Sequence, residues 1–544
     1  MVSQSDMEDK TPPPPNSDKT MANRTIHKTH EEGTVVDADT SYLISSGYKP
    51  QLQRKFSWMQ LFSCAFIVTN SWLGVTGGFS TGLTVGGSAT VIYGLIIVAV
   101  FNVAIIISLS ELVSSMPNAG GQYFWAKKLA PPSQSRISAY ICGICNLLGG
   151  LTGVSSGAVA ASYMILGCIN LSHPDFDIKA WQAFLIAVVF ILLSSLLNFH
   201  ESVITKSVVL GLWWCLMSCY AITIIPAAVA KEHAGPIFIF NSTENSSGWS
   251  STGMAFLVGM INANYAFGLI DAGVHMAEEI PEPEKNVPKA LFMAVGIGFI
   301  TAWPLACALI DCAVDIDAIA GTSTGVPLLQ LFYLSLRNNV AGSIFMQLLV
   351  VTSYFWCIAA AQTYQSRICW AFSRDQGLPF SRLWSQVHPR SKVPVNAHIL
   401  CVCFSIILCI LPLASTTAFN RYIKTIIMPT LEASLEELTL TLSLVTGVII
   451  FPYISIIIPV FYSLLPRNKD VPKGPFNLGR WGTVARVFTI LYCTTVSVIY
   501  CFPYAMPVTA GDMNYISAVI GLVALYAAID WFMRARKYFD QKDQ

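Results

Sequence analysis

The stretch Thr69-Asn-Ser-Trp-Leu-Gly-Val-Thr-Gly-Gly78 interrupts an apolar run, residues 59–82, that is otherwise long enough to cross a membrane as a helix. It places three glycines and four polar side chains within ten residues near the middle of the run. Each glycine lowers helix propensity by about 1 kcal/mol relative to alanine. We therefore expect the helix to unwind locally at this point.

A second interruption occurs in the apolar run 253–277, which contains Gly259-Met-Ile-Asn-Ala-Asn-Tyr-Ala-Phe-Gly268 and continues to Asp271 and His275. Polar and ionisable residues inside a bilayer are costly unless they face a cavity or a partner. The two runs are the first and the sixth of the chain, so they hold corresponding places in two halves of five helices. Interrupted helices at matching positions indicate the midplane binding site of a transporter, although glycines and small polar residues also serve close helix packing.

Apolar runs recur along the whole chain. Its 544 residues are 54% hydrophobic and only 12% charged, with a mean hydropathy of +0.56, whereas soluble domains carry roughly 25% charged residues. This composition excludes a single soluble domain and predicts an all-α polytopic membrane protein, because about 20 apolar residues cross the hydrocarbon core as a helix. The twelve predicted spanning helices are 59–82, 89–113, 138–167, 179–197, 207–229, 253–277, 290–314, 341–366, 397–415, 443–465, 486–506 and 514–533.

The segments around these helices predict the topology. Residues 1–55 are rich in Pro, Ser, Thr and Asp and are predicted to form a disordered tail before a transporter domain of 56–533, which a C-terminal tail of 534–544 follows. Lysines and arginines concentrate in the loops of one side, which by the positive-inside rule places both termini in the cytoplasm. The loop before the sixth helix, predicted to lie outside, carries glycosylation sequons at Asn241 and Asn245.

Other classes of function lack their signatures. The formal net charge is +1, so no basic excess predicts nucleic acid as a partner. The sequence contains no P-loop, HExxH or GxSxG motif, and its eight histidines are dispersed. We therefore expect neither an enzyme nor an ATP-driven pump, and no cofactor or metal. Most of the fifteen cysteines lie inside apolar runs and are interpreted as membrane-embedded hydrophobic residues.

Three motifs carry a family resemblance. They are Pro117-Asn-Ala-Gly-Gly-Gln-Tyr-Phe-Trp125, Asp271-Ala-Gly-Val-His-Met-Ala-Glu-Glu279, and Phe372-Ser-Arg-Asp-Gln-Gly-Leu-Pro379 followed by Val393-Pro-Val-Asn-Ala397. From about residue 50 to 535 the chain resembles the amino acid–polyamine–organocation permeases, and within them the fungal amino acid and choline permeases. Thr69-Asn-Ser-Trp72 and Arg382-Leu-Trp-Ser-Gln386 look most like the fungal choline permeases.

The resemblance implies a LeuT-type fold of two inverted five-helix repeats plus two extra helices, working as a secondary carrier by alternating access. It also implies coupling to protons and residence in the plasma membrane, with the vacuolar membrane as the alternative. The expected substrate is choline or a related small amine such as ethanolamine. Amino acids and gamma-aminobutyrate remain alternative substrates of the same fold, and a non-transporting nutrient sensor is a second alternative.

The predicted substrate site lies between helices one, six and eight. A quaternary ammonium has no N–H donor and is usually held by aromatic faces, at about 0.5–2 kcal/mol per ring. An amino acid would instead place its carboxylate at the helix N-termini that the breaks expose. The aromatic candidates are Trp72, Tyr265, Phe267, Tyr354, Phe355 and Trp356. The candidates for backbone freedom or polar contacts are Gly74, Thr76, Gly77, Gly78, Asn262, Asn264 and Gly268.

Four ionisable residues at the end of helix six are candidates for gating or for a proton relay. Asp271 and His275 could serve as a counter-charge and a relay, or as hydrogen-bonded parts of an inner gate. Glu278 and Glu279 are expected to pair with Arg or Lys in the inner loops. Thr352 and Ser353 of helix eight could serve a sodium site, which leaves the coupling ion open.

One segment departs from the family pattern. Residues 421–442 stand between Asn420 and Ser443, where the family pattern runs directly into the tenth helix. This atypical insert is polar enough to stay outside the membrane. It is either a lineage-specific extracellular loop or an intron retained in the gene model, and sequencing the transcript across the junction distinguishes the two.

Overall fold

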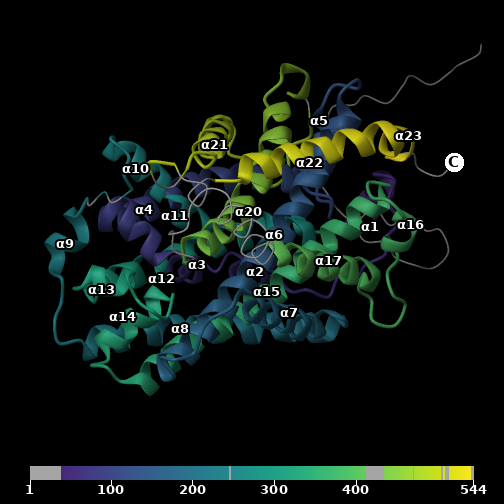
Figure 1. The fold of residues 1–544 in the computed structure, drawn as a ribbon. Helices are drawn as coiled ribbons and strands as arrows, with labels where there is room; N and C mark the ends of the chain where they lie inside the picture. Colours follow the sequence, from purple (N-terminus) through teal and green to yellow (C-terminus); the bar gives the residue numbers. More distant parts are fainter. Residues whose placement is uncertain are drawn as a thin grey trace, which may run out of the picture. The chain divides into compact units, whose positions relative to one another are not determined.

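The computed structural model describes residues 38–243, 245, 247–411, 434–469, 471–503, 506–508 and 514–540. Within these ranges all regular secondary structure is helical (Figure 1). The chain divides into an N-terminal unit up to Gln51 and a second unit from Leu52 onward. The described part of the first unit contains α1, Ala38–Ser45. The predicted disordered tail lies outside the described residues as far as residue 37.

Ten helical segments of the second unit are long and apolar enough to span a membrane. They occupy the places of the second to eighth and tenth to twelfth predicted spans. Apart from the divided sixth span, they are α4 (Phe79–Ser115), α6 (Ser135–Ser172), α7 (Ala180–Ser195), α8 (Glu201–Val229), α12 (Pro283–Asp311), α15 (Val340–Arg374), α20 (Ser434–Ser463), α21 (Arg480–Ile499) and α22 (Ile516–Asp530). α4 is kinked at Gly87, whose φ of 74° and ψ of −179° are not helical. The ninth predicted span begins as α17, Val395–Leu408.

Short helices connect or flank the spans. They are α5 (Gln122–Leu129), α9 (Gly235–Asn241), α13 (Ile316–Ala320), α14 (Pro327–Ser335) and α16 (Ser381–Trp384). Two further pieces, η5 (Trp531–Ala535) and α23 (Arg536–Tyr538), continue α22 toward the C-terminus.

The first span is divided at Asn70. A capping box between Ser57 and Gln60 starts α2, Trp58–Thr69, and the chain then enters α3, Ser71–Gly77. Asn70 between them has φ 34° and ψ 61°, in the left-handed region. Asparagine is one of the few residues other than glycine that adopt this region readily. The predicted break in helix one is therefore present, and it falls at Asn70 rather than at the glycines that follow.

The sixth span is divided in the same way. It consists of α10, Thr252–Gly259, then α11, Ile261–Tyr265, and after Leu269 the 3₁₀ helix η2, Ile270–Met276. Leu269 has φ 55°, which is unusual for a residue with a bulky side chain and stores strain that the surrounding packing must hold. Each of the two predicted interruptions is thus accompanied by one residue in the left-handed conformation, Asn70 in the first span and Leu269 in the sixth.

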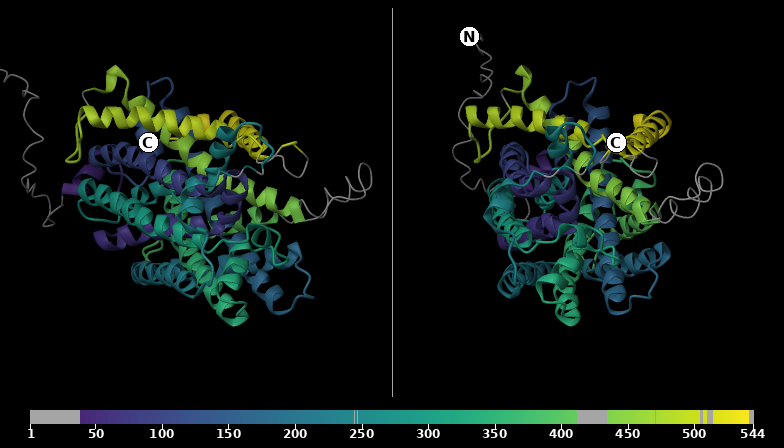
Figure 2. Two further views of the ribbon diagram at one scale, coloured as in Figure 1. Left: turned by 90° about the vertical axis from the view of Figure 1, so that its left-hand side faces the viewer. Right: turned by 60° about the vertical axis from the view of Figure 1, so that its left-hand side comes forward.

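The packing brings the two breaks together. α3 packs against α11, α12 and α15, while α6 packs along α15 and α20. The divided helices therefore lie inside the bundle, surrounded by continuous ones. α22, in contrast, runs along the outside of the bundle in both views of Figure 2.

The atypical insert lies mainly outside the described residues. Its first part, 421–433, is not described, and residues 434–442 form the first turns of α20. The tenth helix therefore begins nine residues before the predicted start at Ser443. Both explanations of the insert stay predictions for the transcript to test.

Candidate functional site

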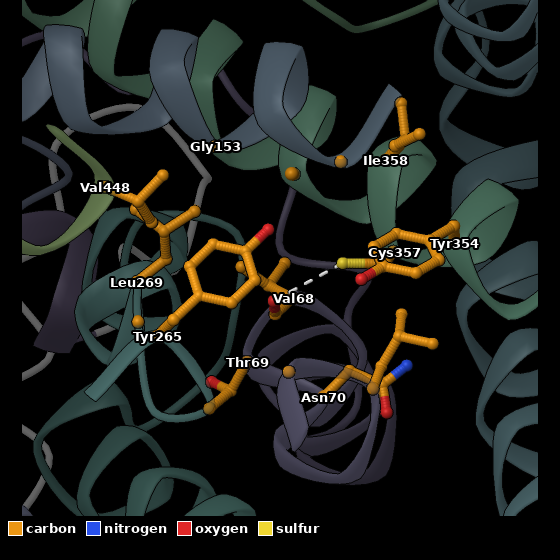
Figure 3. A pocket seen from close by; sticks show the side chains of 15 residues that line it. Val68, Thr69, Asn70, Gly153, Tyr265, Leu269, Tyr354, Cys357, Ile358 and Val448 are labelled. Carbon is orange, nitrogen blue, oxygen red and sulfur yellow. Dashed lines mark hydrogen bonds between the residues drawn. The ribbon is translucent and has the colours of Figure 1, made fainter. Parts of the chain in front are cut away.

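A small cavity of about 30 Å³ lies at the two breaks. Side chains and backbone from α2, α3, α6, α11, α15 and α20 line it, and Tyr265 and Tyr354 present their rings to it (Figure 3). Gly74 and Gly268 also contribute to its wall. Of the predicted substrate-binding residues, these four are the ones that the structure brings to the cavity.

Several polar atoms near the break in helix one have no partner among the residues that the structure describes. The Tyr354 hydroxyl and the Asn70 Oδ1, which both belong to residues lining the cavity, are buried without a hydrogen bond. The same holds for Trp72 Nε1 and Asn262 Nδ2. An unsatisfied buried polar group costs about 1–3 kcal/mol. Unpaired atoms at a cavity are therefore candidates for contacts with a ligand or water.

The glycines of helix one permit close contacts rather than the break itself. A Cβ on Gly74 would lie 2.4 Å from the Cα of Ala266, next to the break in helix six. A Cβ on Gly77 would lie 2.5 Å from the Tyr354 hydroxyl, and one on Gly78 would overlap Asn262. The first span (α3), the sixth span (α11 and the residues after it) and the eighth span (α15) therefore approach each other at distances that only glycine allows.

Asn264 forms a hydrogen-bonding centre away from the cavity. Its Oδ1 accepts from the hydroxyls of Tyr453, at 3.0 Å, and Tyr492, at 2.6 Å. Its Nδ2 donates to the hydroxyl of Tyr500. The residue ties α11 to α20 and α21, so the structure gives it a positioning task that its sequence context did not reveal.

The remaining aromatic candidates do not line the cavity. Trp72 and Phe267 are fully buried in packing contacts, and Phe267 lies near Gly298 of α12. Trp356 packs on Gly211 of α8, while Phe355 contacts Phe190. Thr76 donates to the carbonyl of Leu73 in its own helix. The lining residues that sequence reasoning missed are Val68, Thr69, Asn70, Leu73, Gly153, Gly157, Leu269, Cys357, Ile358, Ala361 and Val448.

A cluster of five buried polar residues, the inner polar cluster, follows the break in helix six. It consists of Gln122, Asn146, Asp271, His275 and Tyr364. Gln122 Nε2 donates to Asp271 Oδ2 at 2.5 Å, and Asn146 Nδ2 donates to Gln122 Oε1 at 3.0 Å. The Tyr364 hydroxyl donates to Asn146 Oδ1 at 2.9 Å and lies 3.3 Å from Asp271 Oδ2. The cluster thus connects α5, α6 and α15 to helix six.

His275 is held in this cluster through both of its ring nitrogens. Its Nδ1–H donates to the carbonyl of Ala119 at 2.8 Å, which leaves Nε2 to accept from Asn146 Nδ2 at 3.0 Å in the neutral ring. The same Nε2 lies 3.5 Å from Asp271 Oδ2. Protonation of Nε2 would therefore create an ion pair with Asp271 and displace the Asn146 amide.

Two buried ion pairs tie the end of helix six to helix eight. Arg374 holds both oxygens of Glu278 at 2.8 Å, and Arg367 holds both oxygens of Glu279 at 2.8 and 3.0 Å. Burial alone raises the pKa of the Glu278 carboxyl, but the Arg374 charge and its hydrogen bonds hold that pKa below its ordinary value. Both partners come from α15 and not from the inner loops, because the last turns of that helix lie beside η2.

The two sequons differ in exposure. Asn241 ends α9 with an exposed side chain. Asn245 is half-buried, and its Nδ2 donates to the carbonyl of Trp249 at 2.8 Å. Asn241 is therefore the more accessible of the two acceptors.

Comparison with known proteins gives the family. The family model described as Amino acid permease matches residues 59–525. A choline transporter of Saccharomyces cerevisiae is 34% identical over 534 residues, which cover 97% of this chain and 90% of that protein. An amino-acid permease of Arabidopsis thaliana is 29% identical over 521 residues, which cover 93% and 96% of the two chains.

A solved structure supports the fold. The crystal structure of a manganese transporter of Eremococcus coleocola matches 90% of this chain and 99% of its own, with a TM-score of 0.56 and 13% identity. The predicted all-α polytopic fold of the LeuT type is thereby confirmed. The family model matches most of the chain, and the choline transporter of Saccharomyces cerevisiae is similar along nearly all of it. The chain therefore belongs to the amino acid permease family of membrane transporters.

Proposed function

We propose that this permease imports choline or a related small amine, such as ethanolamine, by alternating access across the plasma membrane. The observation that carries the proposal is the pair of tyrosine rings, Tyr265 and Tyr354, that face the cavity between the two broken helices. The similarity to the yeast choline transporter supports the same substrate class.

The chemistry of the cavity suits a cation without N–H donors. Among the described residues that line it there is no carboxylate, and Asp271 lies outside the lining with Gln122 as a hydrogen-bond donor. A quaternary ammonium would therefore be held by ring faces and neutral oxygens, where each ring contributes about 0.5–2 kcal/mol. In this conformation the cavity is too small for choline, so binding would require an opening of the kind that alternating access supplies.

Amino acids and gamma-aminobutyrate are the second candidate class. The similarity to an amino-acid permease of Arabidopsis thaliana favours them, and the broken helices would offer free backbone groups to a carboxylate. A non-transporting sensor is a third candidate, which measurable uptake separates from both.

We propose that protons drive the transport, through His275 and Asp271 in the inner polar cluster. The geometry of α15, which is the eighth predicted span, gives less support to a sodium site. Thr352 Oγ1 accepts from Trp214 of α8 at 3.0 Å and donates to its own helix, and Ser353 Oγ donates to the carbonyl of Leu349. Near the cavity, Cys357 and Tyr354 reach helix one instead: Cys357 Sγ donates to the carbonyl of Val68 at 3.6 Å, and the Tyr354 hydroxyl lies beside Gly77.

We further propose that both termini are cytoplasmic and that the loop before the sixth helix is glycosylated. The distribution of basic residues supports this orientation, and the exposure of Asn241 supports it as the acceptor. Loss of an endoglycosidase-sensitive mass in Asn241→Gln is the observation that tests both statements.

Replacing Tyr354 with leucine is expected to raise the KM for radiolabelled choline by roughly 2- to 30-fold, because one aromatic face is lost. Tyr354→Phe keeps the ring and should stay within about twofold of the wild type. The matched control is Phe355→Leu, since Phe355 packs against Phe190 and not on the cavity. Competition by ethanolamine with no competition by amino acids supports the amine reading, and the reverse pattern assigns the site to amino acids.

Replacing Asp271 with asparagine is expected to uncouple choline movement from protons. Without the carboxylate, a proton on His275 Nε2 loses its ion-pair partner 3.5 Å away. Uptake against a gradient should fall by at least tenfold, while exchange of labelled for unlabelled choline continues. The wild type treated with a protonophore is the reference for this split. Concentrative uptake at the wild-type level in Asp271→Asn would contradict the proton relay.

A further inference from the structure

A second cavity of about 300 Å³ lies at the periphery of the helix bundle, between α22 and the helices α6 and α20. Its walls are almost entirely apolar, with Ile141 from α6, Phe451 from α20 and Ala527 from α22 among them. We call it the α22 groove. Water would find few polar partners in it, so a groove of this composition is filled by hydrocarbon rather than by solvent.

The position of α22 explains why the groove exists. The helix is apolar on all sides, and only 6% of its most apolar window is buried in the protein. Leu522, Leu525 and Ile529 lie exposed on its outer face. Its inner face presents Ile520 and Val523 to the groove, together with the small side chains of Ala524, Ala527 and Ala528. Small residues on the inner face leave space between α22 and its neighbours that the protein does not fill.

The groove ends at a segment with the composition of a membrane interface. Trp531 and Phe532 line its end, and Arg536 and Lys537 follow with exposed side chains. Aromatic residues beside lysine and arginine are typical of the headgroup region of a bilayer. Basic side chains at this depth attract anionic headgroups.

Two neighbouring arginines are already engaged within the protein. Arg534 binds Asp530 and donates to the carbonyls of Gln376 and Gly377. Arg136 donates to the carbonyls of Arg536 and Phe539, and thereby fixes the backbone that carries Arg536 beside the start of α6. The backbone that carries the two exposed basic side chains therefore continues directly from Trp531 and Phe532 and is held beside the start of α6.

We propose that the α22 groove binds an acyl chain of an anionic phospholipid whose headgroup lies against Arg536 and Lys537. A concave apolar wall made by three helices fits a single chain. The adjoining positive charge selects an anionic headgroup over a zwitterionic one. A second copy of the protein would instead meet the exposed outer face of α22, which leaves the groove open.

Quenching of Trp531 fluorescence tests this proposal directly. The protein is reconstituted in phosphatidylcholine with a small fraction of phosphatidylserine or phosphatidylcholine brominated near the headgroup end of its acyl chains. Because the chain has thirteen tryptophans, the signal of Trp531 is the difference between the wild type and Trp531→Phe. Brominated phosphatidylserine is expected to quench this signal with roughly fivefold higher apparent affinity than brominated phosphatidylcholine.

Two variants separate the chain site from the headgroup site. Ala524→Phe fills the groove and should reduce quenching by both lipids, whereas Leu522→Phe, on the outer face, should leave it unchanged. Arg536→Gln combined with Lys537→Gln leaves the groove intact, so the two brominated lipids should then quench Trp531 with equal apparent affinity. Equal quenching by both lipids in the wild type, or full quenching in Ala524→Phe, would overturn the proposal. So would shielding of Trp531 from both lipids together with disulfide-linked dimers of Ala524→Cys, because a second copy would then fill the groove.

Discussion

Replacing Gly74 with alanine is expected to abolish transport. The added methyl group would lie 2.4 Å from the Cα of Ala266 and 2.9 Å from its backbone nitrogen, well inside van der Waals contact. Backbone atoms cannot rotate away as the end of a flexible side chain can. The two broken helices would have to separate at the cavity where we propose that the substrate binds.

Uptake of labelled choline should therefore fall by more than tenfold in Gly74→Ala. The matched control is Gly296→Ala in α12, where an added Cβ meets no atom within 4 Å and helix propensity even improves. Surface expression and the monodispersity of the detergent-solubilised protein are measured for both variants. Wild-type kinetics in a correctly localised Gly74→Ala protein would show that this approach of helices one and six is not needed for the cycle.

The broken helices could be predicted because a bilayer makes them exceptional. Glycines also occur in other apolar runs of this chain, but glycines clustered with polar side chains at matching places of the two halves indicate breaks without a structure. The residues that carry the breaks were harder to find. Asn70 adopts the left-handed conformation while Gly74 and Gly77 stay helical, since the close contacts of those glycines depend on neighbouring helices that the sequence does not display. Leu269 has no local signal at all, because only tertiary packing holds a leucine at positive φ.

The sequence also does not show which side chains point toward the cavity. Tyr354, Phe355 and Trp356 are consecutive, so a helix sends them about 100° apart, and only the first reaches the cavity. Which of the three does so depends on how α15 is rotated about its axis. The sequence does not reveal this rotation, because α15 has apolar neighbours on every side. Asn264 was a candidate because the sequence does not show which way its amide points. The amide is engaged by Tyr453 of α20, Tyr492 of α21 and Tyr500, which directly follows α21.

The acidic end of helix six was predictable in kind but not in partner. Glu278 and Glu279 were expected to pair with basic residues, and their partners are Arg374 and Arg367. Arg367 was not a candidate, although it directly follows the eighth predicted run, 341–366, because basic residues were expected in the inner loops, whereas α15 continues past it to Arg374. Its spacing of seven residues from Arg374, about two helical turns, is the signal that could have found it.

Replacing Glu279 with glutamine is expected to destabilise the protein strongly. Arg367 and Glu279 are 1% and 2% exposed and share two hydrogen bonds, so the single variant leaves a buried guanidinium without its counter-charge. Breaking a buried pair in this way costs about 3–5 kcal/mol. The fraction of monodisperse protein that survives a heat step in detergent should drop well below that of the wild type.

The double variant Arg367→Met with Glu279→Leu separates stability from gating. Apolar residues of similar volume often replace a buried ion pair without loss of stability, so the heat-step survival of the double variant should return toward the wild type. If the pair acts in the inner gate, as we propose, transport should not return with it, because the gate would need the pair to part and re-form. Lys285→Gln is the control, since its pair with Glu282 is exposed and such pairs contribute about 0–1 kcal/mol. If the double variant regained both heat stability and full choline uptake, the Arg367–Glu279 pair would hold the fold together without acting in the gate.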